Sequence, residues 1–194
     1  MEGACLISSV KAGEFETVRS LIEAGEDFQA GDRHRMTPLM YAAENNRLQI
    51  VQYLLNRGAQ IDRRDKDGAV CWTAMVFAVR EDCPAIVNQL VESGANVNLV
   101  DYDRKSSPFI IGCQEDRFAC VEKMLLSPGV DLNIVDTHGK TPLMHASIYD
   151  RTNIANLFIT NGADKQKTDN FGKTALDYAR ESKNNVLIAL LSGN

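Results

Sequence analysis

The histidines that could carry acid–base chemistry are few, and no nucleophile accompanies them in a known motif. Only three histidines are present, His34, His138 and His145, and none has a nucleophile at a spacing typical of an active site. The sequence contains no Gly-x-Ser-x-Gly, Gly-x-x-x-x-Gly-Lys or His-Glu-x-x-His pattern. We therefore expect a protein that is not an enzyme. Substrate turnover that depended on His138 or Cys71 would overturn this expectation.

The five cysteines do not form a metal-binding or disulfide framework. Cys5, Cys71, Cys83, Cys113 and Cys120 are odd in number, contain no Cys-x-x-Cys pair and have no histidine three to five residues away. This usage indicates a reducing compartment, no metal site and no cofactor. Cys113 and Cys120 fall at core positions and are predicted to be buried, whereas the exposure of Cys71 stays open.

Composition and charge indicate a soluble protein that interacts with neither nucleic acid nor membranes. The 194 residues are 44% hydrophobic, and 21 basic against 26 acidic side chains give a net charge of -5. No apolar run approaches the ~18 residues that span a bilayer, and Glu2 is an acid where a secretory signal carries bases. We predict a cytoplasmic monomer that does not insert into membranes, and we leave the nucleus open.

Aspartates recur at intervals of 33 to 36 residues, which indicates a structural role for them. The segments that begin at Asp32, Asp65, Asp101, Asp136 and Asp169 are separated by 33, 36, 35 and 33 residues. Within these segments the sequence Thr-Pro-Leu-Met appears at Thr37 and again at Thr141, with weaker copies elsewhere. The chain is therefore a series of about six internal repeats, and the aspartates are assigned to turns.

Each repeat has the signals of two short helices. Thr37 and Thr141 are suitable N-caps, and the proline that follows each suits the first helical position. A second apolar stripe, such as Val51 and Leu54, ends at a glycine such as Gly58, where a left-handed residue is expected. One helix pair cannot bury both stripes alone, so the repeats are expected to stack.

These motifs resemble the ankyrin repeat family over essentially the whole chain. The resemblance implies a mainly α protein, an ankyrin-repeat solenoid of about six stacked helix–turn–helix units with projecting β-hairpin fingers. We expect a single domain over residues 1–194. Its approximate units are 1–31 (N-terminal cap), 32–64, 65–100, 101–135, 136–168 and 169–194 (C-terminal cap).

Two departures from the family pattern carry expectations. The histidine that usually follows Thr-Pro-Leu is replaced, for example by Met40 and Met144, so its hydrogen bonds are expected to be lost to apolar packing. The third unit has three extra residues between Gly68 and Thr73, so its finger, which includes residues 69–72, is expected to be longer than its neighbours.

The family resemblance implies that a protein or peptide partner binds to the concave face and the finger tips. The alternatives are a regulatory subunit that occludes an enzyme, or a targeting arm of a larger effector or signalling protein. Two packing alternatives also stay open: contact of the Trp72 ring with Val70, and packing of Tyr102 and Phe171 between adjacent fingers. The residues predicted to contact a partner are Arg33, Met36, Trp72, Arg80, Tyr102, Gln114, Tyr149 and Phe171.

Two asparagines resemble sites at which ankyrin repeats are hydroxylated. Asn98 follows Ala95-Asn96-Val97, and Asn133 follows Val130-Asp131-Leu132. The alternative is that both side chains only hold their turns through hydrogen bonds. The sequence leaves hydroxylation as the less favoured of the two interpretations.

Overall fold

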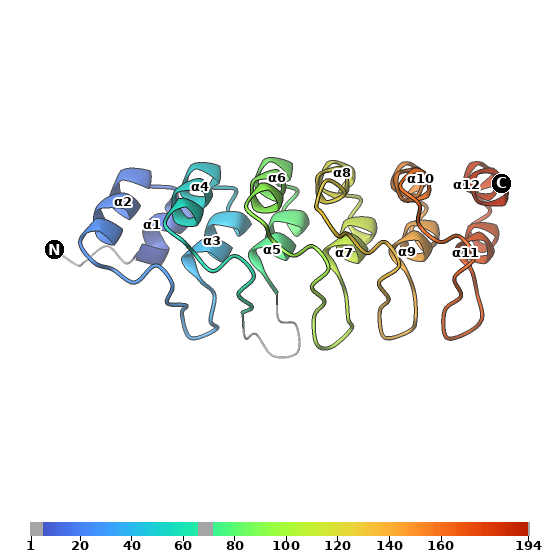
Figure 1. Cartoon of the computed structure of the whole chain (residues 1–194), viewed down its shortest axis with the longest axis horizontal. Helices are drawn as coiled ribbons and strands as arrows, with labels where there is room; N and C mark the ends of the chain where they lie inside the picture. The colour runs from blue at the N-terminus through green and yellow to red at the C-terminus, as the bar shows by residue number, and fades with distance from the viewer. Residues whose placement is uncertain (1–5, 66–71, 194) are drawn as a thin grey trace. The chain divides into compact units, whose positions relative to one another are not determined.

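The computed structural model describes residues 6–65 and 72–193, and within these ranges it contains twelve α-helices and no strand (Figure 1). The helices, each of seven to nine residues, are α1 (Leu6–Ala12), α2 (Phe15–Glu23), α3 (Pro38–Glu44), α4 (Leu48–Asn56), α5 (Ala74–Arg80), α6 (Pro84–Glu92), α7 (Pro108–Gln114), α8 (Phe118–Met124), α9 (Pro142–Ile148), α10 (Thr152–Thr160), α11 (Ala175–Glu181) and α12 (Asn185–Ser192). None of these helices is long and apolar enough to cross a membrane.

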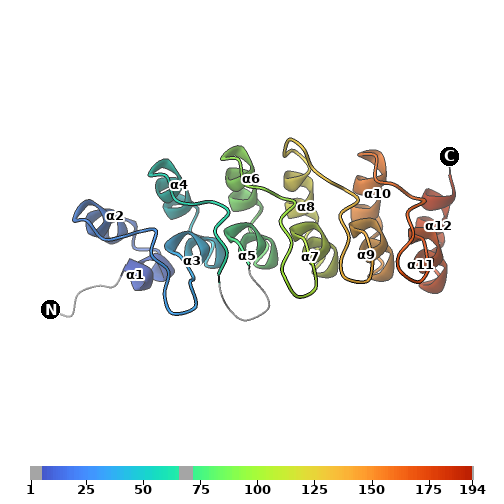
Figure 2. The ribbon, with the colours of Figure 1, turned by 60° about the horizontal axis from the view of Figure 1, so that its bottom comes forward.

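The helices divide between two compact units, Met1–Asn96 and Val97–Asn194. Each unit holds three helix pairs, in which the first helices pack against one another in one row and the second helices in another (Figure 2). The fingers extend from the first-helix row, on the side away from the second helices (Figure 1). The stacked helix pairs confirm the predicted mainly α repeat architecture, and the single domain over 1–194 stays a prediction.

The first helices begin where the sequence predicts, because a side-chain oxygen satisfies an amide of the first turn. The hydroxyl of Thr37 accepts from the backbone N of Met40 at 3.3 Å, and the hydroxyl of Thr141 accepts from Met144 at 3.2 Å. Each of these caps is followed by a proline at the first helical position. Ser107 caps α7 in the same way, with Ile110 at 3.3 Å.

Methionine takes over part of the bonding expected to be lost with histidine, so this expectation is wrong in two repeats. The backbone N of Thr37 donates to the Sδ of Met40 at 3.4 Å, and Thr141 donates to Met144 at the same distance. A thioether sulfur is a weak acceptor, but here it covers a buried amide that has left water. In the last repeat Asp177 does the same with a carboxylate oxygen, 2.9 Å from Thr174 N.

Left-handed residues end the helices where the sequence predicts. Gly58, after α4, has φ 84°, a conformation that costs glycine no side-chain clash. Between the two helices of a repeat the left-handed position is taken by Asn46, with φ 55°, and in later repeats by Asp82, Asp116 and Asp150. Short polar side chains tolerate this region, so these positions need no glycine.

The core of each unit lies between the two helix rows. Ala42 and Ala78 are completely buried in α3 and α5, and their small size lets these neighbouring helices pack closely. In the second unit the rings of Phe109 and Phe158 meet edge to face at 5.8 Å. Cys113 and Cys120 are fully buried, as predicted, and burial raises the pKa of the Cys113 thiol.

The aspartate at the start of each finger holds the finger turn together. The Oδ1 of Asp32 accepts from the backbone N of His34 at 2.9 Å and of Met36 at 3.0 Å. Asp136 and Asp169 make the same pair of bonds, at 2.8 to 2.9 Å. Two backbone bonds close each of these turns, such as Asp32 N to Met36 O at 3.1 Å and Arg35 N to Asp32 O at 2.8 Å.

The predicted β-hairpin character of the fingers is not confirmed, because no finger residue that the structure describes is in a strand. Most of the finger of the third repeat, including residues 69–71 and Cys71, lies outside the described residues. Its two ends, Asp65 and Trp72, are described and are hydrogen-bonded: Asp65 Oδ1 accepts from Trp72 N at 2.6 Å.

The second carboxylate oxygen of the same aspartates ties the finger to its first helix. Asp32 Oδ2 accepts from the hydroxyl of Tyr41 at 2.7 Å, and Asp169 Oδ2 accepts from Tyr178 at 2.5 Å. Burial raises the pKa of Asp169, but bonds from Tyr178 and from two finger amides together hold that pKa below its ordinary value. One carboxylate thus fixes both the shape and the position of a finger.

We predict that Asp169→Ala lowers the free energy of unfolding by about 2–4 kcal/mol, because two amides and one phenol lose their acceptor. Tyr178→Phe removes only the bond to Oδ2 and is expected to cost about 1 kcal/mol. Urea denaturation followed by circular dichroism measures both values. The control is Asp103→Ala, at an exposed finger position, which is expected to stay within about 0.5 kcal/mol of the original protein. Equal stabilities for Asp169→Ala and the control would contradict the role given to the aspartate.

Candidate functional site

A pocket of about 370 Å³ lies on the finger side of the first unit. Two helices and the two fingers before them contribute its walls. The lining residues are His34, Met36, Tyr41, Glu44, Asp65, Trp72, Phe77 and Arg80. Three of them, Met36, Trp72 and Arg80, are residues predicted from the sequence to contact a partner.

The helical walls repeat the same two positions in successive repeats. Tyr41 and Glu44 lie three residues apart on α3, and Phe77 and Arg80 lie three residues apart on α5. Residues at this spacing share one face of a helix, so each helix presents an aromatic ring and a charged group to the pocket. The two helices therefore give the pocket two aromatic rings and two charged groups, Glu44 and Arg80, which we call the rim groups.

The Trp72 ring contacts two other lining residues of the pocket, and its backbone is hydrogen-bonded to a third. Its ring meets the ring of Phe77 edge to face, with centroids 5.5 Å apart. The guanidinium of Arg80 lies 4.3 Å from the centroid of the Trp72 ring, within cation–π range. The backbone of Trp72 is fixed by Asp65. The alternative contact with Val70 lies outside the described residues.

The polar groups around the pocket are mostly engaged in holding its walls. The hydroxyl of Tyr41 donates to Asp32, and Lys11 Nζ lies 3.9 Å from the centroid of the Tyr41 ring. His34 Nε2 accepts from the Nε of Arg33 at 3.0 Å, which makes that ring nitrogen an acceptor. The indole Nε1 of Trp72 is buried and has no acceptor among the described residues.

The structure gives the remaining predicted residues of the first unit supporting positions. Arg33 is exposed and reaches the pocket only through His34. Met36 is 7% exposed, so it forms a wall and offers little surface of its own. Sequence reasoning did not include Tyr41 or Phe77 among the partner-binding residues. Their common position, four residues after Thr37 and Thr73, is the signal that could have indicated them.

The predicted residues of the second unit lie on separate elements. Tyr102 and Phe171 are finger residues with 70% and 69% of their surface exposed, so neither ring is buried between fingers. Tyr149 follows α9 and stacks on His145, with ring centroids 6.2 Å apart and an interplanar angle of 9°. Gln114, at the end of α7, is half-buried, and its carbonyl accepts from an arginine, Arg151.

The two predicted modification sites hold consecutive loops together. Asn98 donates through Nδ2 to the carbonyl of Gly129 at 2.9 Å and accepts through Oδ1 from Asp131 N at 2.9 Å. Asn133 accepts through Oδ1 from Asp164 N at 3.0 Å. These bonds support a role in holding the turns, and hydroxylation of either residue is not tested by them.

A buried imidazole–carboxylate pair stands beside the exposed Tyr149. His145 Nε2 lies 2.9 Å from Asp136 Oδ2, and both side chains are less than one-tenth exposed. Burial lowers the pKa of His145 below its ordinary value and outweighs the opposing effect of the Asp136 carboxylate. Burial would raise the pKa of Asp136, but bonds from Lys140 N, His145 and His138 N together lower it. We infer a neutral imidazole that donates to an ionised carboxylate.

No metal-binding or catalytic constellation accompanies these groups in the residues that the structure describes. No cluster of three or more His, Cys, Asp or Glu side chains in those ranges could hold a metal ion. Among the described residues, His145 is hydrogen-bonded through its side chain to Asp136 and to no nucleophilic side chain.

Comparisons with known proteins identify the repeats. A family model of ankyrin repeats matches residues 6–101 and 109–194. Human palmitoyltransferase ZDHHC17 is 29% identical over 92% of this chain and 33% of its own length. Human ankyrin repeat and SOCS box protein 6 is 35% identical over 70% of this chain and 33% of its own length. The chain thus spans about a third of the length of these relatives.

Solved structures match the whole fold. The ankyrin repeat domain of Bcl-3 is 28% identical, with a TM-score of 0.86, and covers 97% of this chain and 81% of that one. A chain from the structure of a predatory endopeptidase of Bdellovibrio bacteriovorus in complex with an immunity protein is 29% identical, with a TM-score of 0.82. This second match covers 99% of the present chain and 97% of the other.

We predict that His145 makes stability depend on pH. Because its pKa is lower in the folded state, the unfolded chain binds more protons as the pH falls below about 6.5, and the free energy of unfolding decreases there. His145→Tyr places at this position the residue found in two other repeats, Tyr41 and Tyr178, and is expected to remove this decrease between about pH 7 and pH 5.

Urea denaturation across this pH range measures the effect. Asp136 titrates separately, because its lowered pKa moves its own loss of stability to more acid conditions. The control His138→Asn changes an exposed imidazole and is expected to leave the decrease in place. An unchanged pH dependence in His145→Tyr would show that the buried imidazole is not its source.

Proposed function

Because the chain belongs to the ankyrin repeat family, we propose that it is a non-enzymatic module that binds a protein or peptide partner through its finger side. The observation that carries the proposal is the pocket around Trp72 in the first unit. It gives the partner an aromatic anchor point between two fingers of the first unit. The partner-binding residues named from the sequence are retained here as part of the proposal.

The size and composition of the pocket support this function. A volume of about 370 Å³ is at the small end of ligand pockets and suits one or two side chains of a partner. Tryptophan, tyrosine and arginine are the residue types that contribute most to protein interfaces, and all three line it. An apolar partner side chain would lie between Tyr41 and Phe77, against the ring of Trp72.

The pocket is also preorganised. Phe77 and Arg80 already hold the Trp72 ring, so the ring loses little rotamer freedom when a partner binds. The rim groups Glu44 and Arg80 have opposite charge and would set the orientation of a polar partner residue beside the anchor.

A second candidate function is the occlusion of an enzyme by the repeat stack. The observation that favours it is the match over nearly the full length of both chains with a chain from a peptidase–immunity protein complex. In this case the partner would be an enzyme, and binding would reduce its turnover. The matches to a third of longer relatives favour instead a targeting arm of a larger protein.

Three further properties remain proposals. We propose a monomer in the cytoplasm, with the nucleus open, that has no nucleic-acid partner.

Hydroxylation of Asn98 and Asn133 stays the less favoured of the two interpretations of these residues. Peptide mass spectrometry of protein purified from animal cells tests it, since the modified peptide would gain one oxygen atom. Unmodified peptides would leave Asn98 with the turn-holding role described above.

We predict that Trp72→Ala weakens partner binding by about 10- to 30-fold, since loss of a central aromatic anchor costs about 2 kcal/mol. Affinity capture with the original chain, followed by mass spectrometry, identifies the partner, and titration calorimetry then measures the affinity of each variant. Glu44→Arg, which reverses the rim charge without touching the core, is expected to weaken binding as well.

The matched control is Gln52→Ala on α4, whose side chain bonds to Gln89 in the second-helix row. It is expected to bind as the original chain does. Circular dichroism confirms that each variant is folded. If both pocket variants bind with unchanged affinity, the pocket is not the anchor. Where the captured partner is an enzyme, its turnover with and without the chain separates occlusion from simple tethering.

A further inference from the structure

The finger tips of the second unit are joined into one continuous edge. The backbone N of Thr137 donates to the carbonyl of Arg104 at 3.1 Å, and the backbone N of Asn170 donates to that of His138 at 2.9 Å. A third bond runs from Asn170 Nδ2 to the carbonyl of Thr137 at 3.2 Å. We call residues 102–105, 137–140 and 170–173 the fingertip row. Its three fingers are fixed relative to one another.

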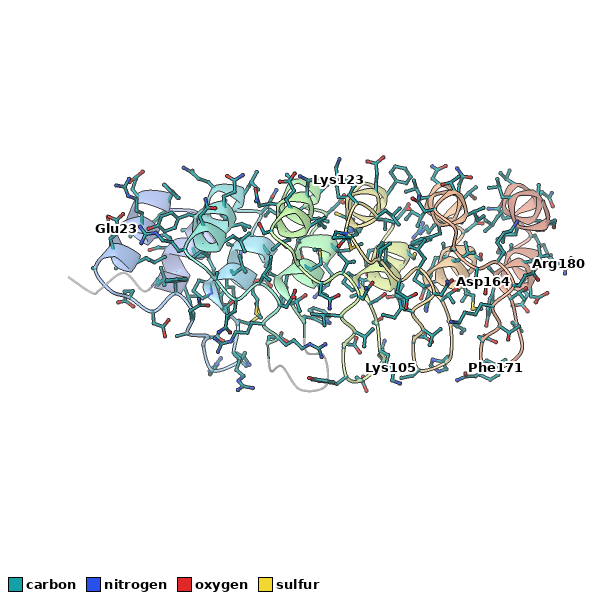
Figure 3. The ribbon with its side chains drawn as sticks, viewed as in Figure 1. Glu23, Lys105, Lys123, Asp164, Phe171 and Arg180 are labelled. Carbon is teal, nitrogen blue, oxygen red and sulfur yellow. The ribbon has the colours of Figure 1, made fainter. Side chains whose placement is uncertain are left out.

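Each end of the fingertip row carries a highly exposed aromatic ring. Tyr102 is 70% exposed on the first finger and Phe171 is 69% exposed on the last. Figure 3 shows Lys105 and Phe171 at the tips of their fingers. Exposed aromatic side chains on an edge held by backbone bonds are characteristic of contact surfaces.

The exposed charge of the fingertip row is mainly positive. Arg104 and Lys105 are exposed, and Lys140 and Lys173 are half-buried. Lys173 also lies 2.6 Å from Glu181, which offsets part of its charge. The row has one exposed carboxylate, that of Asp103, whose Oδ2 lies 3.9 Å from the Nε of Arg104.

The aspartates that begin these fingers add little negative charge at the tips. Asp101 and Asp169 are buried, and the side chain of Asp136 is only 9% exposed. Their carboxylates accept from the amides of their own turns, for example Asp101 Oδ1 from Arg104 N at 2.8 Å. The fingertip row therefore presents basic side chains to solvent although the whole chain has a net charge of -5.

We propose that the fingertip row binds an acidic protein segment that also carries aromatic or aliphatic side chains. This inference rests on the proposed function of partner binding and assigns the chemistry of the partner to the second unit. Acidic side chains of the segment pair with Arg104, Lys105 and Lys140. Its apolar side chains pack on Tyr102 and Phe171.

The dimensions of the row agree with an extended segment. Neighbouring helices lie about 8–10 Å apart, so three successive fingers span about 20 Å. An extended chain advances about 3.3 Å per residue, and about six residues would cross the row. In an extended segment every second side chain lies on the same face, so acidic and apolar residues that share this face contact the row together.

The observations favour a protein segment over a nucleic acid. Proteins that bind nucleic acid tightly contact about 6–10 phosphates, and the row offers four basic side chains. Exposed carboxylates also follow the first helices of the same unit, at Glu115, Asp116 and Asp150. These would repel a phosphate chain that extended beyond the row, whereas a short acidic segment ends within it.

Fluorescence anisotropy of a labelled peptide tests the proposal on the full chain. The probe is a peptide of about twelve residues with Ser at every second position and Glu, Leu and Phe mixed at the positions between, and its counterpart has Gln in place of every Glu. We expect the acidic peptide to bind at least ten times more tightly than the Gln peptide at low salt, with a difference that shrinks as salt is added. Equal binding of both peptides, or no binding of either, would overturn the proposal.

Charge reversal locates the binding site. Arg104→Glu together with Lys105→Glu is expected to weaken binding of the acidic peptide at least tenfold. The matched control, Lys123→Glu together with Lys183→Glu, makes the same change in net charge outside the row. It includes one left-handed lysine, as the test pair does: φ is 52° at Lys105 and 60° at Lys183. A loss of affinity as large in the control as in the test pair would overturn the proposal.

Two further experiments test the aromatic end of the row and distinguish a protein segment from a nucleic acid. Phe171→Ser is expected to weaken the acidic peptide several-fold, and no change would show that the aromatic end is not used. A single-stranded DNA of about twelve nucleotides that displaces the peptide at a lower concentration than the unlabelled peptide does would assign the row to nucleic acid instead. Trp72→Ala should leave peptide binding unchanged, so the row and the pocket of the first unit can fail independently.

Discussion

The arrangement of the fingers depends on the hydrogen bonds of the aspartate carboxylate that begins each finger. One oxygen of Asp32 accepts from two amides of the turn, and the other accepts from Tyr41 on the following helix. The turn and the helix are therefore fixed by one side chain. Without it the turn would keep only its two backbone bonds and would lose its tie to the helix, and binding would have to restrain the segment.

The partner of the second carboxylate oxygen varies between repeats, and this variation shapes the surface. Tyr41 and Tyr178 donate a hydroxyl, and His145 donates an imidazole N–H. In the third repeat the same helical position is Phe77, which has no donor and instead packs against Trp72. The pocket lies at the repeat in which this helical position contributes an aromatic contact, between Phe77 and Trp72, and not a hydroxyl or imidazole donor.

Local features of the structure could be predicted from the sequence, and contacts between repeats could not. The cap at Thr37 and the left-handed residue at Gly58 depend only on neighbouring residues, so residue type and spacing were sufficient. The pocket joins side chains from two repeats, and the tip bond from Thr137 to Arg104 joins residues 33 apart. The Met40 sulfur bond was missed because sulfur is a weak acceptor that composition does not indicate.

Net charge is a poor guide to what a partner meets on this chain. The negative charge of Asp101 and Asp169 is used inside the finger turns, where amide and phenol donors surround it. Arg104 and Lys105 of the finger that begins at Asp101 extend into solvent, and Lys173 of the finger that begins at Asp169 is half-buried. The field felt by an approaching segment depends on exposed charge within about 10 Å, since salt screens the rest. A chain with an acidic average can therefore present a basic edge, because its turn chemistry buries one sign of charge and leaves the other outside.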